Sequence, residues 1–161
     1  MKKTPLLLAG VLGLSLCLPA GAASFAEKRI NTALNKGTPL CWKFQEDNET
    51  LYLNVWVLQK SGPRFLWVGE MHETRKRPTD WRKIDYFGSG SGTLVGAKVM
   101  MQGHDGVYNL PTGMATASSA MLLSTKNLNG TMRVIDREMN GNSQDDDAEY
   151  NTTNLRRIKC S

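Results

Sequence analysis

Alternating apolar and polar residues occupy most of the chain after Pro39. Runs of about four to twelve residues, rich in β-branched and aromatic side chains, are separated by turn-forming pairs such as Asp105-Gly106 and Asn129-Gly130. No long helical pattern interrupts these runs, so neighbouring strands must pair mainly antiparallel. The pattern predicts strands at residues 40–45, 50–59, 64–74, 82–88, 93–102, 107–110, 114–124, 131–139 and 148–159.

A single amphipathic helix is predicted before the strands, over residues 24–37. Ser24 and Glu27 form a capping box, Gly37 is a C-terminal stop signal, and Pro39 prevents the helix from continuing. One face of the helix is apolar, so it should cover other apolar residues. That face consists of Ala26, Ile30, Ala33 and Leu34.

The first predicted strand has two distinct faces. Because side chains alternate along a strand, Leu40, Trp42 and Phe44 should point inward while Cys41 points outward. The next two strands are apolar on both faces, so both faces should be covered. We expect the helix to lie on the outside of this hairpin or to plug a barrel mouth beside it. The alternative is a binding surface for another molecule.

The first 23 residues predict a secretory signal peptide. Two lysines precede an apolar run from Pro5 to Leu18, which is followed by a proline and by small residues suited to cleavage near Ala23. The run is short for a membrane span, so no transmembrane anchor is expected. Lipidation at Cys17 is a competing interpretation, but Leu16 stands where a small residue is needed. The sequence thus predicts a bacterial periplasmic or secreted protein, with one domain over residues 24–161.

Charge excludes one class of partner. The chain carries a net charge of +5, to which Lys2 and Lys3 contribute two, so +3 remains after the predicted cleavage. Nucleic-acid binding depends on concentrated positive charge, and we expect no nucleic-acid partner.

Cysteine positions predict how the fold closes. After cleavage only Cys41 and Cys160 remain, in an oxidising compartment, and a disulfide between them is expected. The bridge would bring the first and last strands together and close the sheet. We therefore predict an all-β fold, a small antiparallel β-barrel of about eight strands with one N-terminal helix. A two-sheet β-sandwich is the alternative.

Few residues suggest catalysis. Glu70 and His72 would share one face of a strand and form a metal or acid–base pair, yet the spacing of a zinc-protease motif is absent. A solvated pair at a strand end is the simpler interpretation. We expect no enzyme, cofactor or metal, with a metal-dependent hydrolase as the remote alternative.

A Ser/Gly-rich stretch, Gly88-Ser89-Gly90-Ser91-Gly92, matches no phosphate-binding motif. Clustered glycines in a strand context indicate a bend, a bulge or a close backbone approach. The alternative is an exposed recognition loop with Ser89, Ser91 and Lys98. Residues 89–92 with Ala97 and Lys98 resemble the Ser/Gly-rich, lysine-bearing recognition strand of bacterial periplasmic lysozyme inhibitors. The resemblance implies a protein–protein inhibitor.

A basic stretch follows the third predicted strand. Arginine forks recognise carboxylate and phosphate groups, and Trp81 adds a stacking face. A charged loop that keeps the hairpin in solution is the alternative to an anion-binding patch. The predicted patch is Arg75, Lys76, Arg77, Trp81, Arg82 and Lys83.

These features predict an exported, non-enzymatic binding protein. A barrel of this size is filled with side chains or holds one small ligand. An apolar or aromatic ligand would contact Trp42, Trp56 and Trp67, whereas an anionic envelope component would use the basic patch. A protein target is the further alternative.

Overall fold

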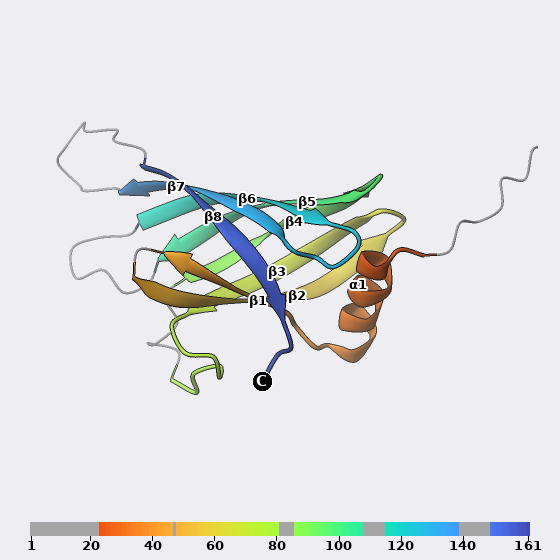
Figure 1. The fold of residues 1–161 in the computed structure, drawn as a ribbon, viewed down its shortest axis with the longest axis horizontal. Helices are drawn as coiled ribbons and strands as arrows, with labels where there is room; N and C mark the ends of the chain where they lie inside the picture. Colours follow the sequence, from red (N-terminus) through yellow and green to blue (C-terminus); the bar gives the residue numbers. More distant parts are fainter. Residues whose placement is uncertain (1–22, 47, 81–85, 108–114, 139–148) are drawn as a thin grey trace, which may run out of the picture.

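Eight antiparallel strands form a closed barrel in the computed structural model, which describes residues 23–46, 48–80, 86–107, 115–138 and 149–161 (Figure 1). Each strand pairs with its neighbours in sequence, and the last pairs with the first. The strands are β1 Leu40–Glu46, β2 Glu49–Ser61, β3 Arg64–His72, β4 Tyr86–Val95, β5 Lys98–Val107, β6 Ala115–Ser124, β7 Gly130–Glu138 and β8 Glu149–Ile158.

The barrel closes where β1 meets β8, as the cysteines predict. Cys41 lies opposite Ile158, and Lys43 lies opposite Arg156. Cys41 and Cys160 form a disulfide with their Cα atoms 5.4 Å apart, across a sequence separation of 119 residues. The predicted eight-stranded barrel is confirmed, and the sandwich alternative is not formed.

The Ser/Gly-rich stretch is part of a strand, which corrects the predicted boundaries. Residues 88–92 lie inside β4, and the turn to β5 falls at Gly96, whose φ is 55°. The predicted break at Asp105-Gly106 lies within the paired region of β4 and β5. The predicted strand at 93–102 is therefore wrong, because it spans the turn between β4 and β5, whereas residues 108–110 of the predicted strand at 107–110 lie outside the described residues. Asp105-Gly106 was taken as a turn signal, whereas the close backbone approach expected of the Ser/Gly-rich stretch is present at Gly90, where a Cβ would overlap the Gln102 carbonyl.

Glycines on β4 and β5 make room for aromatic rings inside the barrel. Gly92 lies opposite Phe65, and a Cβ at Gly92 would overlap the Phe65 ring. A Cβ at Gly103 would lie 2.5 Å from the ring of Trp67. Since the glycines face inward, the alternating Ser89 and Ser91 face outward, where both are exposed.

The N-terminal helix α1, Phe25–Lys36, has the predicted caps. The Ser24 side chain accepts a hydrogen bond from the backbone N–H of Glu27, and Gly37 ends the helix in a left-handed conformation with φ 61°. Ala26, Ile30 and Ala33 are buried. The Ala26 N–H also donates to the carbonyl of Thr125 at 3.0 Å, in the turn between β6 and β7. The helix thus lies across one end of the barrel (Figure 1).

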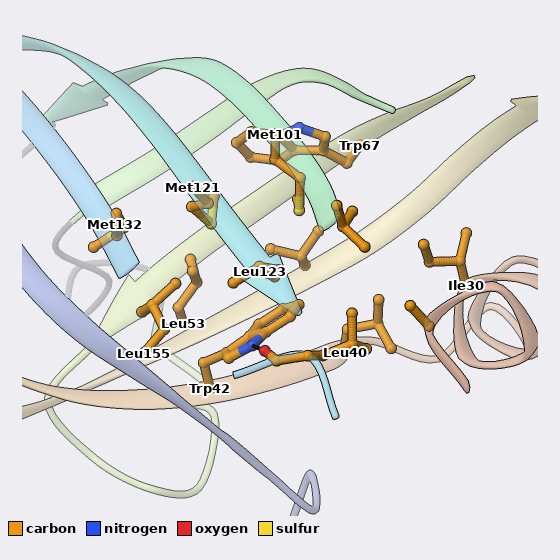
Figure 2. Close-up of a cluster of buried hydrophobic side chains, with 14 of the residues drawn as sticks. Ile30, Leu40, Trp42, Leu53, Trp67, Met101, Met121, Leu123, Met132 and Leu155 are labelled. Atoms are coloured by element: carbon orange, nitrogen blue, oxygen red, sulfur yellow. Dashed lines mark hydrogen bonds between the residues drawn. The ribbon is translucent and has the colours of Figure 1, made fainter. Parts of the chain in front are cut away.

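One hydrophobic core joins the helix to the barrel interior. Figure 2 shows Ile30 of the helix near Leu40, with Trp42 beneath Leu123 and with Met101, Met121 and Met132 further along. Trp42 is fully buried, and its indole Nε1 donates to the carbonyl of Leu128 at 2.7 Å. The predicted inward face of the first strand is confirmed.

The helix does not cover the outer face of the β2–β3 hairpin, so the first of the two predicted positions is wrong. Leu58 is 58% exposed and Leu66 is 50% exposed. The apolar residues of α1 instead belong to the cluster that fills the barrel end. The outer apolar side chains of the hairpin consequently need another explanation.

Candidate functional site

Three buried polar residues lie together on the outer wall of β2 and β3. The Asn54 amide nitrogen is 3.3 Å from Glu70 Oε1 and 2.9 Å from His72 Nε2. Glu70 is 3% exposed and His72 is fully buried. Strand register places them there, because Asn54 lies opposite Glu70 and Tyr52 lies opposite His72. We call Asn54, Glu70 and His72 the polar cluster.

Arg77 connects the polar cluster to the loop that follows β3. Its Nε donates to Glu70 Oε1 at 2.6 Å, and its Nη2 donates to Oε2 at 2.9 Å. This forked pair is the geometry in which arginine binds a carboxylate most strongly. The hydrogen bond that Arg77 donates to Glu70 raises the pKa of Arg77, against the opposing effect of burial. The guanidinium also lies 5.9 Å from the ring centre of Trp56, close enough for a cation–π contact.

The interpretation of Glu70 and His72 as a solvated pair is wrong, because both side chains are buried, and the polar cluster instead anchors the loop through Arg77. His72 stacks on Tyr52 with ring centroids 6.2 Å apart, and its Nδ1 has no hydrogen-bond partner among the described residues. The described residues also contain no group of three His, Cys, Asp or Glu side chains able to hold a metal.

Beside this loop, cations line a hollow of about 310 Å³ on the outer wall of β1 and β8. Strand β1 contributes Lys43, and the end of the chain contributes Arg156 and Lys159. Arg75 of the loop after β3 is the fourth cation. Its backbone carbonyl accepts a hydrogen bond from the Ser161 hydroxyl at 2.9 Å. We call this site the basic hollow, lined by Lys43, Tyr52, Arg75, Arg156, Arg157, Ile158 and Lys159.

The basic hollow concentrates positive charge without a compensating carboxylate. Lys43 and Arg156 lie directly opposite each other across the β1–β8 pairing, an arrangement that destabilises a sheet. No aspartate or glutamate is among the lining residues, all of which are described. Within the described part of the chain, none of Lys43, Arg75, Arg156 and Lys159 forms an ion pair. The arrangement can therefore receive an anion.

Arg157 has a different surrounding, although it also lines the hollow. Its guanidinium lies 5.6 Å from the centre of the Phe25 ring, and Arg29 lies 5.2 Å from the same ring. Burial lowers the pKa of Arg157, and the charge of Arg29 lowers it further. Arginine titrates far above neutral pH, so Arg157 stays charged. Its charge is directed toward the helix, which leaves the other four cations for a ligand.

The structure separates the three tryptophans predicted to bind an apolar ligand. Trp42 and Trp67 are in the core, 0% and 2% exposed, where Trp67 Nε1 donates to the Ser91 carbonyl at 3.2 Å. Trp56 is half-buried on the outer wall under Arg77. The three rings therefore do not line one site.

The predicted basic patch is also divided. Arg75 joins the basic hollow, Arg77 pairs with Glu70, and Lys76 is exposed. Trp81, Arg82 and Lys83 lie outside the described residues. The stretch thus supplies one cation to the hollow and one anchor for the loop.

The outer face of β4 forms the floor of further hollows. One of about 490 Å³ lies between Trp56, Ser89 and His104, and another of about 460 Å³ lies between Leu66 and Ser91. Ser89, Ser91 and Lys98 are all exposed on the outer wall of one hairpin. The predicted recognition residues therefore share a surface, although they belong to strands and not to a loop.

Sequence reasoning missed Lys43, Arg156 and Lys159. The signal was present, because Cys41 and Cys160 fix the two strands beside each other, and Lys43 and Arg156 then fall on the outward face. Only the register, which the cysteines alone do not give, shows that the two cations are opposite each other.

Comparisons with protein-family models, with curated proteins and with solved structures find no match. Among the described residues, no helix is long and apolar enough to cross a membrane.

Proposed function

We propose that the protein is an exported, non-enzymatic binding protein that takes a phosphate- or carboxylate-bearing component of the cell envelope in the basic hollow. One observation carries the proposal: four cations without carboxylate partners converge on one hollow, two of them held opposite each other by strand pairing. A bound anion would relieve the repulsion between Lys43 and Arg156.

The size and chemistry of the basic hollow support binding over catalysis. Its volume of about 310 Å³ is at the lower end of small-molecule sites. Its lining supplies charge and hydrogen-bond donors but contains neither the carboxylate nor the imidazole that most general acid–base sites use. An apolar ligand is less well supported, since the buried apolar side chains of the barrel pack against one another in a single cluster.

The compartment is proposed on two grounds. The Cys41–Cys160 disulfide suits an oxidising environment. The first 23 residues have the composition of a signal peptide. Periplasmic or secreted location is consistent with an envelope ligand.

The test is calorimetric titration at low salt with two probes, pyrophosphate for phosphate groups and trigalacturonate for carboxylates. We expect saturable binding of at least one probe. The double variant Lys43→Gln/Arg156→Gln should weaken it by roughly tenfold or more, because each charge-assisted hydrogen bond contributes about 1.5–3 kcal/mol.

Lys126→Gln/Lys36→Gln is the matched control, because it removes the same charge from exposed positions outside the hollow. It should bind like the wild type. Absence of binding for both probes, or an equal loss in the control, would show that the basic hollow is not an anion site.

A second function is favoured by the surface of the β4–β5 hairpin. Exposed Ser89, Ser91 and Lys98 share its outer face, as the resemblance to periplasmic lysozyme inhibitors requires. A lysozyme-inhibition assay tests it, with Lys98→Ala expected to abolish inhibition and Lys36→Ala to leave it intact. Lack of inhibition by the wild type against both animal and bacterial muramidases would rule it out.

A further inference from the structure

The exposed apolar side chains of the described chain gather toward one end of the barrel. Six large apolar residues are substantially exposed there, whereas the opposite strand ends carry none among the described side chains. They belong to α1 or to the strand halves nearest to it, at the end where the β2–β3, β4–β5 and β6–β7 turns lie (Figure 1). The six are Phe25, Leu58, Leu66, Val95, Met100 and Leu122.

Five of them form a band around the outer wall. Met100 lies opposite Leu122, and Val95 precedes the turn that leads to Met100. Leu66 lies across β4 from this pair, and Leu58 is at the bulge where β2 faces Leu66. We call Leu58, Leu66, Val95, Met100 and Leu122 the aliphatic band.

Cations border the aliphatic band at the turns. Arg64 begins β3 opposite Thr93, Lys98 begins β5 opposite Ser124, and Lys126 lies in the turn after β6. All three are exposed. Lys28, Arg29 and Lys36 add exposed positive charge on the helix.

Negative charge is nearly absent from this end. Of the acidic residues in the described ranges, only Glu27 lies here, and it pairs with Lys60 at 3.5 Å. Glu46, Glu49, Glu70, Glu73 and Asp80 lie toward the opposite strand ends or in the loop after β3. The end of the barrel that carries α1 thus combines positive charge with exposed apolar side chains.

We propose that the end of the barrel carrying α1 docks on a bilayer surface rich in anionic lipid. The aliphatic band enters the boundary between headgroups and acyl chains, while Arg64, Lys98 and Lys126 contact lipid phosphates. Exposed apolar patches of this kind mark interaction sites, and basic residues beside aliphatic ones suit an anionic membrane interface. This surface is separate from the basic hollow and does not depend on its ligand.

The composition of the band favours lipid over a protein partner. Protein–protein hot spots are enriched in Trp, Tyr and Arg, whereas the band contains only Leu, Val and Met. The uniform sign of the bordering charges matches a surface of one charge. A second copy of the chain that used the same surface would bring like charges against each other, which disfavours that partner.

Co-sedimentation of the purified chain with phosphatidylcholine vesicles, with and without phosphatidylglycerol, tests the proposal. We expect binding only when phosphatidylglycerol is present, with loss in high salt because the lipid charge is screened. Lys98→Gln/Lys126→Gln should weaken binding by about fivefold per cation. Leu58→Ser/Leu66→Ser/Leu122→Ser should weaken it by roughly tenfold or more, since three apolar side chains no longer enter the bilayer.

Arg156→Gln is the matched control, because its charge is in the basic hollow, and it should bind vesicles like the wild type. The substituted leucines are exposed, so an unchanged melting temperature verifies the fold. Three results would overturn the proposal: no sedimentation with anionic vesicles at low salt, sedimentation unaffected by the leucine variant, or an equal loss in Arg156→Gln. Concentration-dependent dimerisation abolished by the leucine variant, without vesicle binding, would assign the band to a second copy.

Discussion

The inner and outer faces of β1 and β8 come from alternate residues of the same strands, yet they have opposite characters. Inward, Trp42 is fully buried and Leu155 is 2% exposed, both within one hydrophobic cluster. Outward, Lys43 and Arg156 lie opposite each other with no carboxylate among the residues around them. Packing explains the inner face. The outer face carries like charges that do not help the barrel fold, which is why we assign binding to it.

The largest expected effect on stability comes from removing the Cys41–Cys160 disulfide, which separates the contribution of the covalent bridge from that of core packing. Cys41→Ser/Cys160→Ser removes the bridge on the outer face while leaving the inner cluster intact. Closing a loop of this length should stabilise the fold by about 4 to 5 kcal/mol in the chain-entropy model. Urea denaturation should show a loss of this order. A loss below about 1 kcal/mol would mean that packing alone holds β1 against β8.

Substitutions of two neighbouring residues on β1 test how much the inner and the outer face each contribute to the free energy of unfolding. Trp42→Ala should lower the free energy of unfolding by about 3 to 5 kcal/mol, because it leaves a cavity and removes the hydrogen bond to Leu128. Lys43→Ala should change it by less than about 0.5 kcal/mol, or should stabilise the fold by relieving repulsion with Arg156. Thermal and urea denaturation measure both. A larger loss for Lys43→Ala than for Trp42→Ala would reverse the assignment of the faces.

The ion pair between Glu70 and Arg77 holds the loop over the outer wall, and substituting its two members should lower stability by unequal amounts. Arg77→Ala leaves the 3%-exposed carboxylate of Glu70 without its cation and should cost about 2 to 4 kcal/mol. Glu70→Gln leaves Arg77, whose side chain is 53% exposed, able to reach water and should cost about 1 kcal/mol. Equal losses, measured by urea denaturation, would indicate that Glu70 is not effectively buried.

Much of the fold follows from local signals, and the errors have physical reasons. The capping signals at Ser24 and Gly37 place the helix, and Cys41 with Cys160 predicts closure. The glycines of β4 gave the wrong strand ends, since their role depends on Phe65 packing from another strand. Local sequence does not show that contact.

The candidate site was less predictable because it joins distant segments. Arg75 was identified from its basic stretch, but Lys43 and Arg156 meet only through the register of β1 with β8. The tryptophans were grouped by residue type, whereas strand alternation sends Trp42 inward and Trp56 outward. Tertiary pairing, not composition, determines which residues share a surface.

An NMR titration with pyrophosphate is the most direct test of whether the ligand binds in the basic hollow on the outer face of β1 and β8. The measured quantities are the backbone amide chemical shifts. We predict saturable shifts at Lys43, Arg75, Arg156 and Lys159 of the basic hollow, with little change at Met101, Met121 and Leu123 in the core. Shifts concentrated at the core residues, with the amides of the basic hollow unchanged, would contradict the assignment and place the ligand inside the barrel.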